Sequence, residues 1–443
     1  MARREGFLRF GAFLYPTGHH IAAWRHPDAV PGAGLDIRHY AALAREAEAA
    51  RFDLIFLADG VGTRGDRPEV LSRTAHSYVS QFEPLTLLSA LSMVTEKIGL
   101  VGTASTSFNE PFHIARKFAS LDHLSGGRSG WNLVTSSSEF EARNFNRDKH
   151  FEHAERYARA SEFADVVRGL WDSWDDDAFL WDKAGGRVFD PARRHVLHHK
   201  GTHFSVQGPL NVARSPQGRP VLVQAGSSED GKALAARSAE VVFTAQQTLE
   251  DAVAFYADLK GRLAAHGRSP DSLLIMPGVF PVVGASESEA REKFEQLQSL
   301  IDPVLGLSLI SGLTGGVDLS GHDLDGPIPE LPLTNASQSR QELTLALARR
   351  ENLSIRQLYH RVAGARGHWQ LVGTPEQIAD QLEERFVHHG ADGFNIMAPV
   401  LPNGLQDFAR RVLPELRRRG LARQDYEGQT LRDHLGLVRP QRG

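Results

Sequence analysis

A run of small residues, Gln224-Ala225-Gly226-Ser227-Ser228, stands between an apolar stretch and a helical pattern that begins near Asp230. Small residues at such a junction leave backbone N–H groups accessible, and the dipole of the following helix favours an anion there. The run therefore predicts a turn that binds phosphate. Simple capping of the helix by Ser227 or Ser228 is an equally good interpretation.

Two further polar residues are associated with apolar stretches that have the composition of strands. Asp59 comes directly after Leu57-Ala58, and Thr103 lies inside the stretch 98–107. Active sites of parallel barrels are built at the carboxyl ends of the strands, so Asp59 would lie at that rim. A turn or cap role for Asp59 and a packing role for Thr103 are the alternatives.

Histidines and glycines form patterns that suggest other chemistry. The histidines gather as His19-His20, as His150 and His153, and around His199, but none has the spacing of a zinc site, so we expect no metal. The segment 60–65 matches G-x-G-x-x-G, yet no amphipathic helix follows it. We interpret it as a glycine-rich loop and not as a nicotinamide site.

The elements that must position these residues alternate regularly along the chain. Short β-branched and aromatic stretches predict eight strands, at 8–15, 53–59, 98–107, 129–136, 220–227, 240–245, 273–283 and 393–398. Amphipathic stretches predict helices between them, at 36–51, 84–95, 111–124, 156–171, 230–239, 249–266, 287–300 and 375–389. This alternation predicts an α/β fold, a (β/α)8 TIM barrel of parallel strands.

Two long segments interrupt the alternation. One, at about 175–219, is rich in Asp, His and Gly; the other, at about 303–373, is glycine-rich at first and helical over 341–349. We expect a single barrel domain over 1–443 with these two insertions. The composition from 303 to about 325 predicts a mobile loop that closes over the carboxyl face of the barrel. The alternative is a surface segment that packs elsewhere.

Composition limits the class of protein. The 443 residues are 41% hydrophobic and 23% charged, which suits a large globular core. The net charge of −4, without a long run of like charges, gives no sign of nucleic-acid binding. The absence of cysteine excludes disulfides and thiol nucleophiles. Because we find neither a signal-peptide pattern nor an apolar run of membrane length, we expect a cytoplasmic protein that does not bind membranes.

A set of ordered motifs resembles a known family. The longest is LDHLSGGRSGWNLVTS at 121–136, and the others are EARNF at 141–145, RY at 156–157, LWDSW at 170–174, GPLN at 208–211, RSPQG at 214–218 and QAG at 224–226. Together they resemble the nitrilotriacetate and dibenzothiophene-sulfone monooxygenases, a branch of the bacterial-luciferase-like proteins. The resemblance runs from Phe10 to about Leu437.

The resemblance implies a luciferase-type barrel that is the oxygenase component of a two-component, FMN-dependent monooxygenase. Reduced FMN would come by diffusion from a separate NAD(P)H:flavin reductase, and dioxygen would be used to oxidise a small sulfur- or nitrogen-containing organic molecule. A homo-oligomer, dimer or tetramer, is also implied. A deazaflavin-dependent oxidoreductase on the same barrel and a non-catalytic flavin-binding barrel are the alternatives.

The resemblance also implies roles for individual residues. The positions that would contact FMN are Asp59, Thr103, His153, Tyr157, Ser227 and the adjacent Ser228. His20 would face the substrate as the catalytic histidine, with His19 as the alternative. Aromatic pocket walls would come from Phe13, Phe56 and Phe243, for which ordinary core packing is the alternative. The segment 311–314 reads SGLT, without the histidine of the sulfone-oxidising relatives, which argues against a dibenzothiophene-sulfone substrate.

Overall fold

Eight parallel strands close into a barrel in the computed structural model, which describes residues 4–65, 67–136, 138–314, 316–332, 338–365 and 367–442. Each strand pairs with two neighbours, and β10 pairs with both β9 and β11, so the sheet has no open edge within the ring. The predicted strands and the predicted barrel are confirmed. The barrel strands are β1 (Arg9–Phe13), β2 (Leu54–Leu57), β3 (Gly99–Ser105), β4 (Ser129–Val134), β9 (Val221–Ala225), β10 (Val241–Thr244), β11 (Leu274–Val283) and β13 (Gly393–Ile396).

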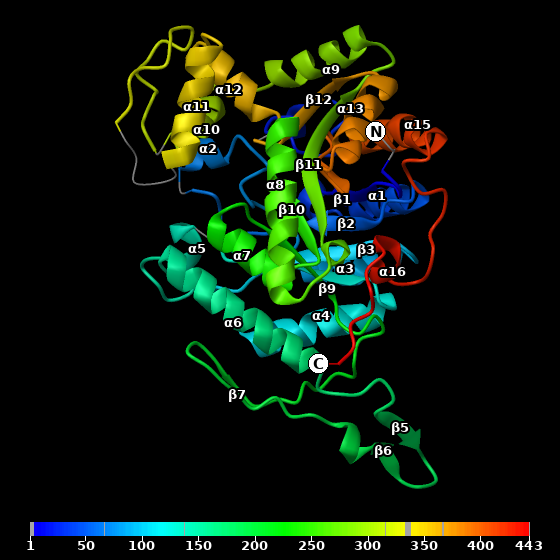
Figure 1. The fold of residues 1–443 in the computed structure, drawn as a ribbon. Helices are drawn as coiled ribbons and strands as arrows, with labels where there is room; N and C mark the ends of the chain where they lie inside the picture. Colours follow the sequence, from blue (N-terminus) through cyan, green and yellow to red (C-terminus); the bar gives the residue numbers. More distant parts are fainter. Residues whose placement is uncertain are drawn as a thin grey trace.

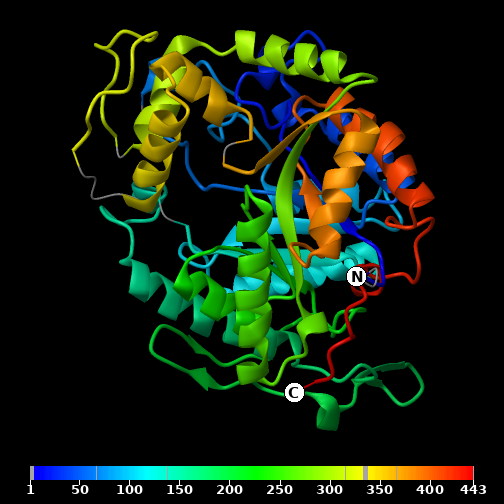
Figure 2. The same ribbon diagram turned by 45° about the horizontal axis from the view of Figure 1, so that its top comes forward.

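Helices surround this barrel (Figure 1, Figure 2). All eight predicted helices are present: α1 (Ile37–Ala49), α3 (Pro84–Leu91), α4 (Pro111–Ser125), α6 (His153–Trp171), α7 (Glu229–Ser238), α8 (Leu249–Arg262), α9 (Glu287–Ser299) and α13 (Pro375–Val387). Their starts follow from local chemistry, because Thr374 and Gln377 form a reciprocal capping box and Pro375 occupies the first turn of α13. Among the described residues, no helix combines the length and the apolar composition that crossing a membrane requires.

Several short elements complete the chain. They are α2 (Pro68–Leu71), α5 (Glu139–Arg143), α14 (Asn403–Asp407), the π-helix η6 (Phe408–Val412), α15 (Leu413–Arg418) and α16 (Leu431–Leu435). Short 3-10 helices are η1 (Ala23–Arg25), η2 (Ala33–Leu35), η3 (Pro191–Arg193), η4 (Leu263–His266) and η5 (Pro270–Ser272).

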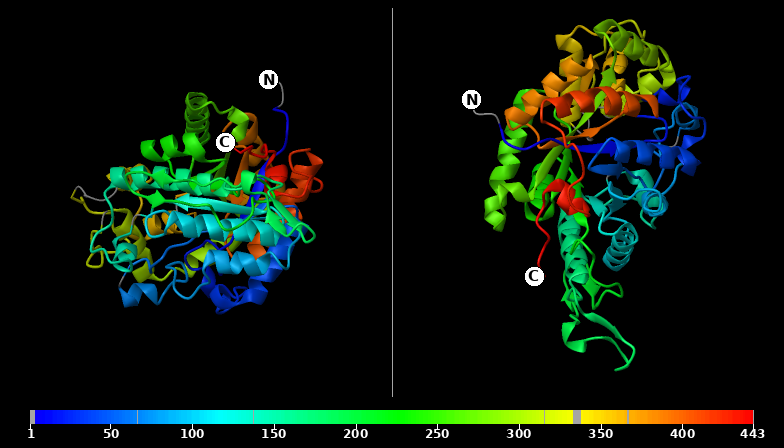
Figure 3. Two further views of the ribbon diagram at one scale, coloured as in Figure 1. Left: turned by 90° about the horizontal axis from the view of Figure 1, so that it is seen from below. Right: turned by 90° about the vertical axis from the view of Figure 1, so that its right-hand side faces the viewer.

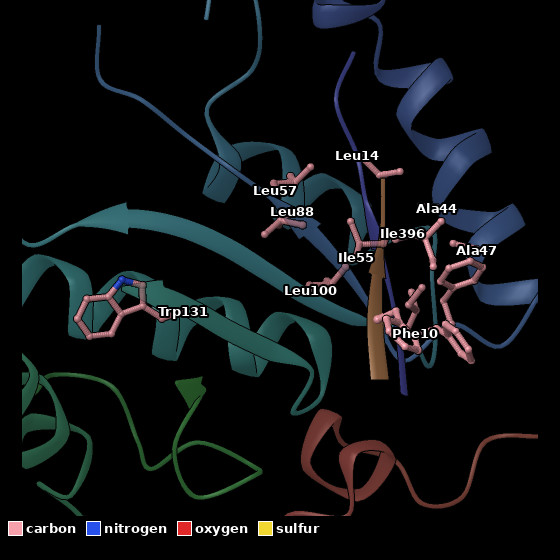
Figure 4. Packing of buried hydrophobic residues seen from close by; sticks show 14 of the residues in the cluster. Phe10, Leu14, Ala44, Ala47, Ile55, Leu57, Leu88, Leu100, Trp131 and Ile396 are labelled. Carbon is pink, nitrogen blue, oxygen red and sulfur yellow. The ribbon is translucent and has the colours of Figure 1, made fainter. Parts of the chain in front are cut away.

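The two faces of the strands have different partners. Phe10, Ile55 and Leu100 point outward, with Ala44 and Ala47 of α1 beside Phe10, and Trp131 of β4 points outward at a separate place toward α4 and α6 (Figure 4). The alternate residues point into the barrel, where Leu54 and Val101 pack with Leu431 and Leu435 of α16. A Cβ on Gly99 would lie 2.3 Å from Leu431, so glycine lets α16 approach the strands. The amino end of the barrel is thereby filled, and a ligand site is left to the carboxyl end.

The segment 175–219 leaves the barrel as an arm (Figure 1; Figure 3, right). It consists of two small antiparallel pairs, β5 (Phe179–Asp182) with β6 (Arg187–Phe189) and β7 (His199–Lys200) with β8 (Ser205–Val206). Glu162 of α6 accepts hydrogen bonds from His199 Nε2, the His203 N–H and the Phe204 N–H, each at 2.9 Å. These bonds fasten the β7–β8 pair to the barrel's outer helices.

The second insertion differs from what the sequence predicted. Residues 303–313 form the helix α10 (Pro303–Leu313), so the prediction of a mobile loop is wrong for this part. It packs on α12 (Ile355–Ala363), and a Cβ on Gly306 would lie 2.6 Å from the Tyr359 ring. Gly306 permits a close contact between the two helices, although a glycine-rich segment is also typical of a loop.

The rest of this insertion is also built from regular elements. The helix predicted at 341–349 is confirmed as α11 (Gln338–Arg350). An unpredicted strand, β12 (Trp369–Gly373), pairs with the second half of β11 outside the barrel ring. We call α10, α11 and α12 the cap; it stands beside α2 and α9 at one end of the molecule (Figure 1, Figure 2).

Candidate functional site

Aromatic side chains fill the barrel interior at the carboxyl ends of β1, β2 and β10. The ring centroids of Phe13 and Phe56 are 4.8 Å apart, and Phe243 lies 5.6 Å from each of them. All three occupy inward positions of the strand alternation. The structure therefore brings the three predicted wall residues together.

More rings join these three than the sequence analysis identified. We call the aromatic cluster the set Phe13, Tyr15, His19, Phe56, His76, Tyr78, Phe243 and His368. Tyr15 lies two residues after Phe13 on the same face of the first strand. Because side chains of a strand alternate with a period of two, this pattern could have identified Tyr15 from the sequence. His76 and His368 come from loops, where no local pattern indicates direction.

The two neighbouring histidines have different surroundings. His19 lies in the aromatic cluster, 4.4 Å from the Phe13 ring between centroids, and its Nε2 donates to the Phe13 carbonyl at 2.9 Å. His20 points away, toward α9: its Nδ1 accepts from the Ala22 N–H at 3.2 Å, and its Nε2 donates to Gln298 Oε1 at 2.9 Å. Burial lowers the pKa of His20 to about 4, so its ring is neutral at neutral pH. With both nitrogens bonded, His20 is placed to hold its loop and not to face the aromatic cluster.

Asp59 follows β2 at the same end of the barrel. Burial raises the pKa of this carboxyl to about 7, and the nearby carboxylates of Glu83 and Glu141 add to the effect. The next residue, Gly60, lies so close to Tyr78 that a Cβ would be 2.8 Å from its ring. Asp59 is thus a partly buried acid that changes its charge near neutral pH, beside the aromatic cluster.

Arg64 and Tyr78 lie against each other at one side of the aromatic cluster. Arg64 donates to the Tyr78 hydroxyl at 2.7 Å, and its guanidinium lies 4.3 Å from the centre of the Tyr78 ring. The Tyr15 hydroxyl donates to the Tyr78 hydroxyl at 3.1 Å. Tyr78 has a φ of 53°, a conformation that costs free energy in a non-glycine residue and is enriched at functional sites.

Thr103 lies deeper, inside the barrel, with its hydroxyl already engaged. The hydroxyl donates to the Leu57 carbonyl and accepts from Asn132 Nδ2, both at 2.8 Å. Asn132 Oδ1 is buried and has no hydrogen-bond partner among the described residues. This amide, from the GWN part of the longest sequence motif, is a further residue of the site that the sequence analysis did not single out.

A separate polar group forms where α6 and α7 begin. The Ser228 hydroxyl donates to the Tyr157 hydroxyl at 3.4 Å and accepts from the Gly231 N–H at 3.1 Å, so Ser228 caps α7. The His153 ring lies tilted beside Tyr157, with 4.9 Å between ring centroids, and its Nδ1 lies 3.1 Å from Asp230. Ser227 is exposed in the same turn. The structure brings all four predicted residues of this group together, and Asp230 adds a carboxylate beside His153.

These groups fit a flavin mononucleotide in two respects. A Cβ on Gly226 would only reach ordinary van der Waals contact, at 3.7 Å or more, and Ser227 and Ser228 are exposed, so the turn 226–228 is accessible to a phosphate at the start of α7. Asn132 Oδ1, which has no partner in the described part of the chain, suits an N–H donor of a flavin ring. Both lie at the carboxyl ends of parallel strands, on one side of the barrel. No group of three or more metal-ligating side chains was found in the part of the chain that the structure describes.

Comparison with known proteins gives consistent matches over the whole length. The family pattern of the luciferase-like monooxygenases matches residues 13–393. The chain is 52% identical to N-acetyl-S-(2-succino)cysteine monooxygenase of Bacillus subtilis (strain 168), with 99% of each chain covered. It is 53% identical to nitrilotriacetate monooxygenase component A of Aminobacter aminovorans, with 98% of this chain and 97% of the relative covered.

A solved structure agrees with these relatives. A riboflavin lyase, crystallised with modified FMN and riboflavin, matches with a TM-score of 0.85 and 34% identity, and the alignment covers 97% of this chain and 96% of the lyase.

Proposed function

The chain belongs to the luciferase-like monooxygenase family, and on that premise we propose that it is the oxygenase component of a two-component monooxygenase that uses reduced FMN and dioxygen. The observation that carries the proposal is that three features lie at one end of the barrel: an exposed turn at the start of α7, a buried amide oxygen with no hydrogen-bond partner among the described residues, and a cluster of aromatic rings. Reduced FMN would supply the electrons that activate dioxygen.

The residues of the phosphate turn would hold the cofactor. Tyr157 and Ser227 would contact the phosphate, Ser228 would keep α7 capped, and His153 would exchange Asp230 for the phosphate. Thr103 and Asn132 would receive the ring end, and Asp59 would lie beside it. Tyr157, Ser228, Thr103 and Asn132 are already held by hydrogen bonds within the protein, so this part of the site is preorganised.

The aromatic cluster would bind the substrate and exclude water. Within it we assign the substrate-facing histidine to His19, because His20 bonds to Gln298 and Ala22. The Phe13 carbonyl accepts from Nε2 of His19, so Nδ1 is the acceptor nitrogen in the neutral tautomer. His20 becomes the positioning residue of the same loop.

The two relatives at 52% and 53% identity act on molecules that carry several carboxylates and a sulfur or nitrogen atom. We propose a substrate of the same kind: a small organic molecule with sulfur or nitrogen at the oxidised centre. Arg64, at the edge of the aromatic cluster, is the cation placed to pair with a substrate carboxylate. A panel of sulfur- and nitrogen-containing carboxylates, with their amides as controls, tests this assignment.

The test of the function separates the chain from its electron source. The purified chain with NADH, oxidised FMN, dioxygen and the substrate panel should form no product. An NADH:FMN reductase placed behind a dialysis membrane should restore product formation, because only reduced FMN has to cross. Rapid NADH oxidation by the chain alone would contradict the proposal. Turnover with a reduced deazaflavin in the absence of dioxygen would favour the alternative oxidoreductase, and tight FMN binding without any turnover the non-catalytic barrel.

A further inference from the structure

A cleft of about 450 Å³ lies outside the barrel ring, away from the aromatic cluster and the phosphate turn. Its volume is in the range of small-molecule sites. The cleft lies between α9 and the α14–η6 segment, over the last residues of β11. We name it the α9–η6 cleft, after the elements that form its two walls.

The floor of the α9–η6 cleft is apolar and the rim is charged. Val282, Leu297 and Val400 are among the buried side chains of the floor. Three cations, Lys293, Arg410 and Arg411, and two carboxylates, Asp28 and Asp407, line the rim. Glu46 and Glu289, outside the lining, also pair with Arg410 and Lys293, so a ligand with one negative charge and an apolar body would have Arg411 as its partner on the rim.

Arg411 is the rim cation that is least satisfied by the protein. Lys293 donates to Asp407 at 3.0 Å and to the Val283 carbonyl at 2.9 Å, and Arg410 donates to Glu46 at 2.9 Å. The nearest carboxylates of Arg411, on Asp407 and Glu289, are 3.6 Å and 4.0 Å away, beyond hydrogen-bond distance. Its guanidinium thus has two carboxylates at ion-pair distance but none within hydrogen-bond distance among the described residues, and it can form charge-assisted hydrogen bonds with a ligand carboxylate.

The backbone under Arg411 is unusual. Residues 408–412 form a π-helix, with Phe408 and Val412 buried and the two arginines on the cleft side. Pro414 explains the wide turn, because it lacks an N–H and its ring crowds the carbonyl four residues earlier. Single π-turns are found frequently at functional sites.

The wall of the cleft also holds the loop of the candidate active site. The N–H of His19 donates to the Ala398 carbonyl at 2.8 Å, that of His20 to Pro399 at 3.1 Å, and that of Leu401 to Thr17 at 2.8 Å. Pro399 and Val400 line the cleft, and Leu297 precedes the Gln298 that holds His20. A molecule in the cleft would touch both segments that fix the position of the His19–His20 loop.

We propose that the α9–η6 cleft is a second ligand site, for a small amphipathic monocarboxylate, and that its occupation stabilises the His19–His20 loop. The carboxylate binds Arg411, and the apolar body lies on Val282, Leu297 and Val400. The site is distinct from the one in which substrate and flavin are proposed to bind, and its existence does not depend on the oxygenase assignment.

Isothermal titration of the full chain with benzoate and hexanoate tests the site, with benzamide and hexanamide as uncharged probes. FMN is kept saturating so that the phosphate turn is filled. One carboxylate per chain should bind, at least about tenfold more tightly than its amide. Arg411→Gln should weaken carboxylate binding at least about tenfold, whereas the matched control Arg418→Gln, at an exposed arginine paired with Glu415, should not change it.

A second variant and a second measurement test the proposed site without relying on Arg411. Gln296→Trp, at an exposed position of α9, should fill the cleft and abolish binding of acid and amide alike. Hydrogen exchange should show that benzoate slows the amides of His19, His20 and Leu401. Equal affinity for acids and amides would overturn the proposal. So would binding that survives both variants, or protection confined to 226–231.

Discussion

At the scale of single residues, the function depends on which atoms are already bonded. Ser227 is exposed in the phosphate turn, whereas Ser228 caps α7 and touches Tyr157. A change at Ser227 therefore tests the ligand contact with the least damage to the helix. Neighbouring residues of the same type have different tasks here, as His19 and His20 also do.

Ser227→Asp should weaken FMN binding at least about tenfold more than riboflavin binding, because the new charge repels the phosphate that riboflavin lacks. Binding of both is measured by quenching of flavin fluorescence. Ser227→Asn is the matched control, since it has nearly the same size and no charge. Equal losses for both flavins in the aspartate variant would mean that Ser227 only supports local structure.

Asp59 predicts a pH dependence of stability. Its pKa is raised by burial from 3.8 to about 7, so the folded chain keeps a proton that the unfolded chain releases at lower pH. The free energy of unfolding contributed by this group falls as pH rises from about 4 to about 7 and is constant above. Between about pH 5.5 and 8.5 the wild type should lose up to about 2 kcal/mol more than Asp59→Asn.

Urea unfolding of the ligand-free chain at both pH values measures this difference. Asp148→Asn, at an exposed position, is the control and should follow the wild type. If Asp59→Asn keeps the full pH dependence of the wild type, another group is responsible and the carboxyl of Asp59 is not held protonated.

At the scale of elements, the cap shows how glycine has two opposite uses. Gly306 faces Tyr359 of α12 and has no room for a side chain, whereas a Cβ on Gly312 of the same helix would meet no atom of the described residues within 4 Å. One glycine is required by packing, and the other only lowers the helix propensity of α10. The two positions give a matched pair of variants.

Gly306→Val should force α10 away from α12 and lower the free energy of unfolding by about 1–3 kcal/mol. Gly312→Ala should leave it unchanged or raise it by up to about 1 kcal/mol. Chemical unfolding gives both values, and hydrogen exchange should be faster in α10 and α12 of the valine variant. A valine variant as stable as the wild type would mean that the contact with Tyr359 is easily relaxed.

Shielding of the site by the segment 303–325 stays a prediction, now assigned to a helical cap in place of a mobile loop. If the cap excludes water, Gly306→Val should raise the share of consumed dioxygen that ends as hydrogen peroxide. Catalase addition during oxygen-electrode measurements gives that share. An unchanged share, in a variant whose cap exchanges faster, would exclude a shielding role.

At the scale of the whole molecule, the arm is the feature that the barrel does not explain. Leu180, Trp181 and Val188 of the β5–β6 hairpin are exposed, Trp181 to 69%, on a projection that extends away from the barrel (Figure 3, right). Exposed apolar groups gathered on one element are typical of protein interfaces. The homo-oligomer implied by the resemblance stays a prediction, and the hairpin is the surface on which it can be tested.

Trp181→Glu should shift the chain toward the monomer in light scattering after size-exclusion chromatography, because a charge would have to be buried in the interface. Val438→Glu, at an exposed apolar residue outside the arm, is the control and should leave the mass unchanged. A wild type that is already a monomer at micromolar concentration would contradict the oligomer itself. An oligomer that Trp181→Glu leaves intact would place the interface elsewhere.

The sequence by itself determined the ring of strands and the helices around it. Each of these elements has a local cause that is visible in the chain: β-branched stretches for the barrel strands, and for helices such as α13 a cap, a proline and a helical period. The ordered motifs around 121–136 also sufficed to indicate the family. The local sequence does not explain α10. Gly306 predicts a loop when its neighbours alone are considered, and only the contact with Tyr359, 53 positions later, gives the packing reason for a glycine in this helix.

Only the tertiary structure decided how the site is assembled. His19 and His20 are residues of the same type at adjacent positions. Their roles differ because His20 donates to Gln298 of α9, whereas His19 donates to the Phe13 carbonyl of β1. His368 joins the aromatic cluster through Phe243, more than a hundred residues away in the chain. The direction of a side chain in a loop is set by such distant contacts and not by its neighbours in sequence, which is why no local pattern could predict it.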